Sequence, residues 1–407
     1  MRSCGVVVEY NPFHNGHYYH LEQAREHSGA DVMIAIMSGH FLQRGEPAIM
    51  DKWHRAEAAL KNGADLVLEL PFLYAVQHSD YFSQGAVQTL IEAGVDAICF
   101  GSESGDIDAF MKAYSHMNDY QEEYNTALRT HLNEGHSFPE SSRLAYESIQ
   151  FPSEAVDLSQ PNNILGYSYV KQIMSYAPSV TPLTIHRKSS HYHDEHITGP
   201  IASATSIRRQ MIEAGALTKE TKQTMPAEVP DLLDDYKNTY GCWHQWEAYF
   251  HLLQYKVLTM DEETLRCFHG MDEGLEYRLK RAMKKAVTFE DFMNRVKTKR
   301  YTWTRLQRTM THLLVGTDKD EARRGLRETP PPYARILGMN ETGRKYLKWA
   351  KKETETSFIT QPQAMQHPLL DLESRAAAAY YSLLPAADRV SRLNREYEAP
   401  VILSTNM

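Results

Sequence analysis

The chain is predicted to have an α/β fold, with a mostly parallel sheet in its first half followed by a mainly helical C-terminal part. Two observations support this. Short β-branched apolar runs alternate with single helical segments near the start, which indicates βαβ units and a parallel sheet. After about Met211, apolar residues recur at helical spacing instead. With 407 residues, two domains are expected, and the boundary is placed near residue 215, giving 1–215 and 216–407.

The individual elements follow in chain order. The expected strands are Gly5–Glu9, Asp31–Met37, Asp65–Leu70, Val95–Phe100 and Thr181–His186. The expected helices are Gly16–His27, Trp53–Lys61 and Ser83–Glu92, with a polar helical excursion over Asp106–Phe151. In the second half, Thr288 with Asp291 resembles a capping box, and Pro330–Pro332 breaks the helical pattern. Parallel sheets bind ligands beyond the carboxyl ends of their strands, so the turn after the first strand is a candidate ligand site.

Composition narrows the class of protein. The 42% hydrophobic and 24% charged residues are an ordinary globular balance. Four separated cysteines form no CxxC pair, which fits a reducing compartment and suggests neither a zinc site nor a disulfide framework. No apolar run reaches the roughly 18 residues of a membrane span, and Val6–Val8 is too short for a signal peptide. A cytoplasmic protein is therefore expected, and no protein partner is implied.

The turn after the first strand carries the chemistry. It runs from Glu9 to His17, with Gly16 at the start of the first helix. A helix N-terminus offers free backbone N–H groups to phosphate. His14 and His17 share a helical face and could donate hydrogen bonds as charge builds on the α-phosphate of ATP. A pair of core or solvent-facing histidines is the alternative, but the position between strand and helix favours ATP binding, with His14 and His17 as catalytic residues.

A second motif lies downstream, at residues 202–208. Ser203 and Thr205 could cap a helix and contact phosphate, and Arg208 could neutralise departing pyrophosphate as a third catalytic residue. The alternative is an ordinary N-cap followed by a solvated arginine.

The segment from Arg278 to Arg308 is strongly basic. It holds eleven Lys or Arg residues and two acids, inside a chain of net charge −8. Such a patch favours contact with the phosphates of RNA. The residues expected to bind the RNA backbone are Lys297, Lys299, Arg300, Arg305 and Arg308. The interleaved aromatic residues could stack on bases, but the spacing of Phe289, Phe292 and Trp303 favours packing.

The two phosphate motifs resemble those of the HxGH nucleotidyltransferase superfamily, with its ISSTxxR partner, from which the chain departs at Ala202 and Ala204. Longer stretches together resemble the tRNA(Met) cytidine acetate ligase family over nearly the whole chain. They are residues 5–17, 38–48, 100–103, 161–166, 192–194 and 299–308. His40 stands where Gln is expected in that family.

This resemblance implies a Rossmann-like nucleotidyltransferase sheet and a specific reaction. Acetate attacks ATP to give acetyl-adenylate and pyrophosphate, and the acetyl group passes to N4 of the wobble cytidine of elongator tRNA(Met), giving N4-acetylcytidine. Mg²⁺ is expected with the ATP phosphates, without a dedicated metal site. The ATP-binding residues that it implies, besides Ser203 and Thr205, are Val7, Val8, Glu9, Tyr10, Asn11, Pro12, Phe13, His14, Asn15, Gly16, His17, Tyr18, Tyr19, His20, Gly101, Asn162, Arg187 and Lys188.

Several points stay open at the level of sequence. Arg44 could pair with acetate, bind tRNA phosphate or brace its own loop. His193 and Asp194 are possible bases for the cytidine amine. Alternative functions are a cofactor-type adenylyltransferase acting on a phosphorylated small molecule, a relative of class I tRNA synthetases, or a nucleotide sensor without chemistry.

Overall fold

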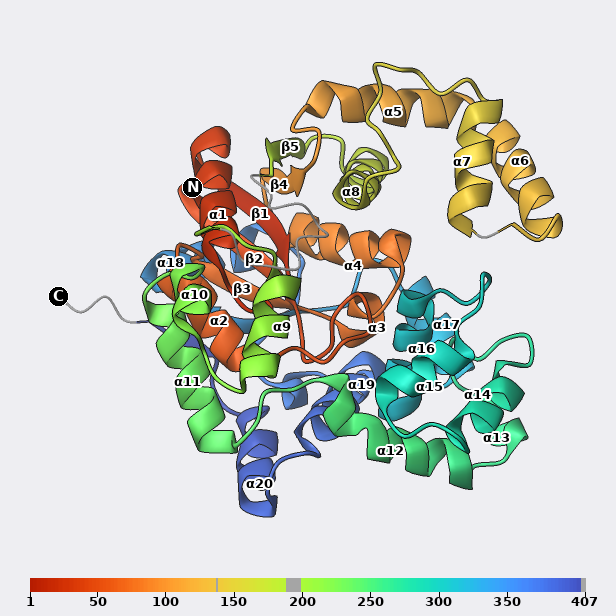
Figure 1. Ribbon diagram of the computed structural model, residues 1–407. Coiled ribbons are helices and arrows are strands. Elements are labelled where there is room, and N and C mark those ends of the chain that lie inside the picture. The colour runs from red at the N-terminus through yellow and green to blue at the C-terminus, as the bar shows by residue number, and fades with distance from the viewer. Residues whose placement is uncertain (137, 188–198, 404–407) are drawn as a thin grey trace.

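The computed structural model describes residues 1–136, 138–187 and 199–403, and an eight-stranded sheet forms its centre (Figure 1). The strand order is β5-β4-β1-β2-β3-β6-β7, and β8 pairs with β6. The strands are β1 (Ser3–Val8), β2 (Val32–Ser38), β3 (Leu66–Leu70), β4 (Ala97–Ser102), β5 (Thr181–His186), β6 (Ala334–Met339), β7 (Phe358–Ile359) and β8 (Val401–Ile402). Strands β1 to β5 are parallel to one another, so the predicted α/β fold is confirmed.

Helices surround the sheet and build the rest of the described chain. They are α1 (Asn15–Ser28), α2 (Lys52–Lys61), α3 (Phe72–Ala75), α4 (Ser79–Glu92), α5 (Ile107–Asp119), α6 (Gln121–Asn133), α7 (Phe138–Ser148), α8 (Pro161–Tyr176), α9 (Ala204–Ala214), α10 (Lys219–Gln223), α11 (Glu228–Tyr240), α12 (Trp246–Thr259), α13 (Glu262–Arg266), α14 (Leu275–Met283), α15 (Phe289–Val296), α16 (Trp303–Val315), α17 (Lys319–Arg327), α18 (Glu341–Glu353), α19 (Pro368–Tyr381) and α20 (Ala386–Arg395), with a short 3-10 helix, η1 (Pro362–Ala364).

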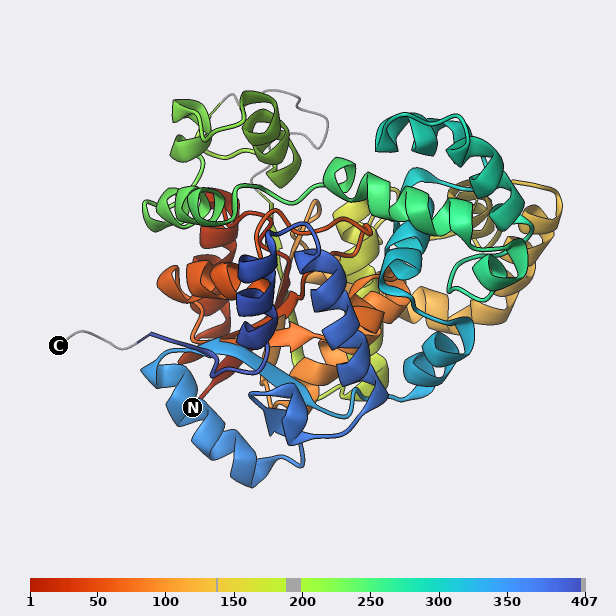
Figure 2. The same ribbon diagram turned by 90° about the horizontal axis from the view of Figure 1, so that it is seen from below.

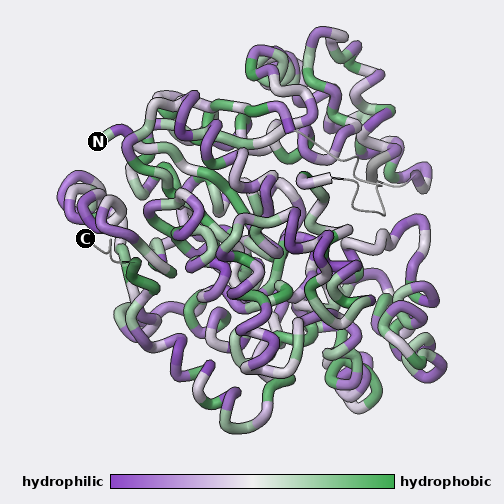
Figure 3. The backbone as a smooth tube through the Cα atoms, turned by 60° about the vertical axis from the view of Figure 1, so that its left-hand side comes forward, coloured by the Kyte–Doolittle hydropathy of each residue, from purple (hydrophilic) through white to green (hydrophobic). Residues whose placement is uncertain are grey.

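Both faces of the sheet are buried, which is why its strands read as continuous apolar runs. Along β1 and β2, Val6 and Ala35 belong to the core beneath α1 and α2, whereas Ile34 and Ile36 belong to the core beneath α4 and α8. Figure 3 shows the apolar segments gathered in the middle of the molecule and hydrophilic segments on the outer helices. In the part of the chain that the structure describes, no helix combines the length and apolar character that crossing a membrane requires.

The strand order reverses at β1. The chain builds β2 and β3 on one side of β1, then returns to place β4 and β5 on the other side. In open parallel sheets the ligand crevice lies at this switch point, outside the carboxyl ends of the two strands. Here those ends are the turn that begins at Glu9 and the segment Gly101–Glu103, the two places where the sequence analysis expected ATP.

The second half of the chain is helical from α10 to α17, but it then rejoins the sheet. Strand β6 pairs antiparallel with β3, and β7 and β8 pair with β6. Figure 2 shows the blue C-terminal helices α19 and α20 across the body of the molecule, away from the α5–α7 excursion. The sequence analysis missed β6, a six-residue run between Pro332 and Asn340 whose partner strand is far away in sequence. The boundary at residue 215 stays a prediction, but residues 334–402 complete the sheet of the first half.

A buried cluster of charges joins this returning segment to the sheet. The carboxylate of Glu396, at the end of α20, contacts Lys52 Nζ at 2.7 Å, His40 Nε2 at 3.0 Å and Arg335 Nη2 at 3.1 Å. It also accepts a hydrogen bond from Trp53 Nε1 at 3.1 Å. Burial alone would raise the pKa of Glu396, but the Lys52 ammonium and its other partners hold that pKa well below its usual range. His40, which differs from the family pattern, is therefore a buried partner of the C-terminal segment.

Candidate active site

Two imidazole rings open helix α1. His14 is the N-cap residue, and its Nδ1 accepts a hydrogen bond from the backbone N–H of Gly16 at 3.0 Å. His17 Nδ1 accepts the backbone N–H of His14 at 3.3 Å, which completes a reciprocal capping box. An Nδ1 that accepts a hydrogen bond carries no proton, so in each neutral ring the proton sits on Nε2. Both Nε2–H groups are thus donors.

The residues around these rings hold them in place. Gly16 is needed because a Cβ at this position would lie 2.8 Å from His14 Cε1. Tyr10 and Phe13 pack against His17, with ring centroids 5.0 and 5.7 Å from it. Tyr10 adopts a left-handed backbone conformation, with φ of 50°, an uncommon state for a bulky residue. The turn is therefore shaped to present the two histidines.

Burial and nearby cations keep these imidazoles neutral. Burial, followed by the charges of Arg187 and Arg208, lowers the pKa of His14 to about 3. Burial, followed by His14 and Arg187, holds the pKa of His17 well below its usual value. His20, one turn further along α1, has its pKa lowered to about 4 by burial and by Arg187. Its Nε2 is buried without a hydrogen-bond partner among the described residues.

The second motif meets the first at these helix starts. Asn15 Nδ2 donates to Pro200 O at 2.8 Å, just before α9. Ser203 is the N-cap of α9 and accepts the N–H of Ser206 at 3.1 Å, while Thr205 is exposed. On the same helix, Arg208 donates to Asn11 O at 2.8 Å and pairs with Glu46 at 3.0 Å. The structure thus brings His14, His17 and Arg208 to one edge of the sheet.

Residues at and near the carboxyl end of β4 form the other side of the crevice. Arg187 Nη1 donates to Asn162 Oδ1 at 2.7 Å, and Asn162 Nδ2 donates to Glu103 Oε1 at 2.6 Å. Glu103 also accepts the backbone N–H groups of Asn162 and Asn163, so its carboxylate caps α8. A Cβ at Gly101 would lie 3.1 Å from Arg187 Cγ. The side chain of Asn162 is thus used to orient Arg187, a role that the sequence analysis did not foresee.

Some expected ATP-binding residues lie in the core. Val8, Tyr10 and Phe13 are buried beneath the turn, and Asn11 is 3% exposed with its Oδ1 bonded to Ile49 N. The side chains of these residues are therefore withdrawn from a ligand in the crevice. The other expected residues of this segment (Val7, Pro12, Tyr18 and Tyr19) lie along β1, in the turn and on α1, and Tyr18 is exposed. Lys188, His193 and Asp194 fall outside the described residues.

The loop at residues 38–48 connects this edge to the helical half. Its Gln43 N–H donates to Glu9 Oε1 at 2.8 Å. Gly45 has φ of 75°, and a Cβ there would lie 2.4 Å from the backbone nitrogen of Arg308 in α16. The carbonyl of Gly45 accepts hydrogen bonds from Trp246 at 2.7 Å and Thr311 at 2.8 Å. The loop is pinned between the sheet and helices α12 and α16.

Basic residues extend from this loop across the helical half. Arg308 forms no hydrogen bond or ion pair with the described residues, and burial, Arg305 and Arg44 lower its pKa to about 10. Arg305 stacks over the ring of Tyr301 at 4.8 Å. Further along, Lys297 and Lys299 are exposed, and Arg300 is also exposed but pairs with Glu273. Arg308 has no acidic partner among the described residues and lies near Arg305 and Arg44, which favours an anion at this position.

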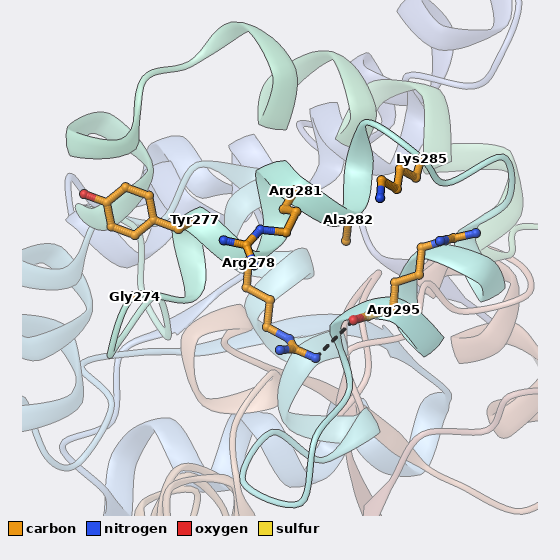
Figure 4. Close-up of a pocket in the computed structure, with 7 residues that line it drawn as sticks. All are labelled: Gly274, Tyr277, Arg278, Arg281, Ala282, Lys285 and Arg295. Carbon is orange, nitrogen blue, oxygen red and sulfur yellow. Dashed lines mark hydrogen bonds between the residues drawn. The ribbon is translucent and has the colours of Figure 1, made fainter.

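A shallow groove continues this basic surface. It has a volume of about 420 Å³, and Figure 4 shows Arg278 and Arg281 of α14 facing Arg295 of α15 across it, with Lys285 beyond. Arg278 itself is used to cap α15, since it donates to the carbonyls of Arg295 and Val296. Arg281 and Lys285 pair with no described residue.

The expected packing of aromatic residues is confirmed in this region. Phe289 and Phe292 are buried, and the ring of Trp246 stacks on Phe289 with centroids 4.7 Å apart. Tyr277, by contrast, is 55% exposed at the rim of the groove. Any base stacking would therefore fall to Tyr277 rather than to the two phenylalanines.

Comparison with known proteins defines the class. The family model described as "HIGH Nucleotidyl Transferase" matches residues 1–396, which makes the chain a nucleotidyl transferase of that family. More narrowly, the chain belongs to the tRNA(Met) cytidine acetate ligase family. It is 48% identical to the tRNA(Met) cytidine acetate ligase of Oceanobacillus iheyensis, over 99% of this chain and all of that one. It is 43% identical to the Bacillus subtilis protein of that name, over 93% and 92% of the two chains.

Solved structures agree with this assignment. The apo crystal structure of Thermotoga maritima TmcAL covers the whole of both chains with a TM-score of 0.91 and 32% identity. A second crystal structure of that protein, bound with alpha-thio ATP, covers both chains with a TM-score of 0.89 and 32% identity. The predicted family is confirmed, and an ATP analogue binds this fold in the Thermotoga protein.

Proposed function

We propose that this protein activates acetate with ATP and transfers the acetyl group to N4 of the wobble cytidine of elongator tRNA(Met). The observation that carries the proposal is the pair of neutral imidazoles at the start of α1, each with its Nε2–H free to donate. Family membership supports the choice of substrates. A cofactor-type adenylyltransferase is not favoured, because the relatives that match over nearly full length are named as tRNA ligases.

In the first step, ATP lies in the crevice between β1 and β4. An acetate oxygen attacks the α-phosphorus, and the bond to pyrophosphate breaks. The Nε2–H groups of His14 and His17, with the N–H groups of α1, stabilise the charge on the phosphates. Arg187, which lies against Gly101, and Arg208, which donates to Asn11 O, add positive charge near the phosphates. Ser203 and Thr205 at the start of α9, and Gly101 under Arg187, complete the proposed ATP site.

Mg²⁺ is proposed to accompany ATP, with phosphate oxygens as its main ligands. The carboxylates near this site are poor candidates for metal ligands, because Glu103 caps α8 and Glu46 pairs with Arg208. The described cluster with metal-type ligand atoms within 4.8 Å of one another is His131, Glu134 and His136, which belongs to the distant α6–α7 excursion.

In the second step, the cytidine amine attacks the acetyl carbonyl and AMP leaves. The RNA is proposed to follow the basic surface from Arg44, Arg305 and Arg308 to Lys297, Lys299 and Arg300. Lys297 and Lys299 are exposed without an acidic partner among the described residues, and Arg308 also lacks one. This supports the proposal, because a phosphate backbone would supply the counter-charges. A cytoplasmic location is proposed with this role.

The direct experiment incubates the protein with ATP, labelled acetate and bulk tRNA, and digests the tRNA to nucleosides. Label in N4-acetylcytidine, dependent on ATP, is the expected result. Label in no nucleoside, with pyrophosphate released only when a phosphorylated small molecule is added, would favour the adenylyltransferase instead.

A further inference from the structure

The transfer step needs a base, because the cytidine amine loses a proton when it becomes an amide. The described residues at this edge offer few candidates. His14 and His17 use Nδ1 in the cap of α1 and carry a proton on Nε2, so they donate rather than accept. Glu46 is paired with Arg208, and Glu103 is bonded to the N-terminus of α8.

Glu9 differs from Glu46 and Glu103 in that it forms no ion pair and caps no helix among the described residues. It follows β1 directly, and Arg55 fixes its carbonyl with a hydrogen bond of 2.6 Å. Its Oε1 accepts the N–H of Gln43 at 2.8 Å, whereas its Oε2 accepts no hydrogen bond from a described residue. The residue is half-buried, so a substrate can reach it.

The position of Glu9 suits the second substrate. The nucleotide crevice lies on the β4 side of β1, while Gln43 holds Glu9 toward the loop at residues 38–48 on the β2 side. That loop contacts α16, where the basic surface begins. An RNA following this surface reaches β1 from the side opposite the nucleotide, and Glu9 lies where the two would meet.

We propose, on the basis of the proposed function, that Glu9 is the proton acceptor of the transfer step. The cytidine N4 forms a bond to the acetyl carbon, and the bond from that carbon to the AMP oxygen breaks, with its electron pair leaving on AMP. The N4 proton moves to Glu9 Oε2 and from there to water. Glu9 thereby acts as a catalytic residue in addition to the two histidines.

The charged and titratable groups around Glu9 come from four elements. They are Arg44 and Glu46 of the loop, Arg208 of α9, Arg55 of α2 and Tyr169 of α8. Burial raises the pKa of Glu9, and Gln43 N–H, Arg44 and Arg208 oppose that rise. A carboxyl whose pKa lies above its ordinary value is better matched to a proton acceptor near neutral pH.

The test separates the two half-reactions in single turnovers. Wild type and Glu9→Gln are given ATP and labelled acetate, acetyl-adenylate is measured, and tRNA is then added over about pH 5 to 8. Because the amide still accepts the Gln43 N–H, the fold should be kept. Acetyl transfer by Glu9→Gln should be about 10²-fold slower than by wild type, a larger loss than the loss in adenylate formation. The wild-type transfer rate should decline toward low pH as Glu9 takes up a proton, and this acidic limb of the pH–rate profile should be absent from the variant.

Two further variants complete the experiment. Glu46→Gln removes the neighbouring carboxylate, and its pH–rate profile should keep the acidic limb. Glu9→Asp should transfer acetyl more slowly than wild type, but its profile should also keep the acidic limb. The inference is overturned if Glu9→Gln transfers acetyl at the wild-type rate, if it keeps the limb, or if Glu9→Asp loses it. Failure of wild type to form acetyl-adenylate would instead reject the proposed function.

Discussion

The rings of His14 and His17 stack with centroids 3.7 Å apart and planes within 24°. Each ring accepts a backbone N–H at Nδ1, so protonating either one would break the cap of α1 and place a cation against its neighbour. The same hydrogen bonds that start the helix therefore fix which nitrogen carries the proton. The cap of α1 and the proposed phosphate contacts thus depend on the same two hydrogen bonds.

Replacing His17 with alanine should lower acetate-dependent exchange of pyrophosphate into ATP by about 10²- to 10³-fold, the usual effect of losing one donor to a developing charge. The helix keeps its His14 cap, so the melting temperature should change little. His27→Ala, in the last turn of the same helix and exposed, is the matched control and should exchange normally. Exchange by His17→Ala within a few-fold of wild type would contradict the role of His17.

Replacing His14 with asparagine tests the depressed pKa. Asparagine is also a good N-cap, so stability at neutral pH should be close to that of wild type. Below pH 6.5 the unfolded wild-type chain takes up a proton at this histidine, but the folded chain does so only near pH 3. Wild type should therefore lose stability relative to the variant as pH falls, by about 1.4 kcal/mol per pH unit. Urea unfolding of both proteins from about pH 7 to 5 measures this difference, and parallel curves would refute it.

Neutralising Lys299, Arg300 and Arg305 together should weaken tRNA binding and flatten its dependence on salt, because each lost phosphate contact removes about 0.7 to 0.9 from the slope of log affinity against log salt. ATP binding should be unchanged. The control changes Lys348, Lys351 and Lys352 of α18 to glutamine, which removes the same charge from another exposed surface. Equal salt slopes for the two triple variants would take the RNA contact away from the basic segment.

Replacing Glu396 with glutamine should lower the free energy of unfolding by about 3 kcal/mol, because Lys52 and Arg335 would keep buried charges with too few counter-charges. Glu398→Gln is the control, since that side chain is 63% exposed and its nearest cation lies 3.9 Å away. Denaturant unfolding measures both. A loss as small as that of the control would mean that the buried cluster adds little to stability.

The features that could be predicted from the sequence are those set by residues close together in the chain. The apolar runs of β1 to β5 and the turn from Glu9 to His17 are local, and the structure has them within a few residues of the expected bounds. The sequence did not predict pairings between distant segments. The contact of Glu396 with Lys52, the chain from Glu103 through Asn162 to Arg187, and the pairing of β6 with β3 join residues that no periodicity connects. The motif residues could therefore be named, but not the partners that orient them.

The pairing of β6 with β3 also bears on biosynthesis. Lys52 and Glu69 are made early and pair with each other, but each lacks its second partner until Arg335 and Glu396 have emerged from the ribosome. The N-terminal half thus cannot reach its final packing while the polypeptide is still being translated. A truncated product of this gene should be recognised by the cell's chaperones and proteases as unfinished, rather than persist as a smaller working catalyst.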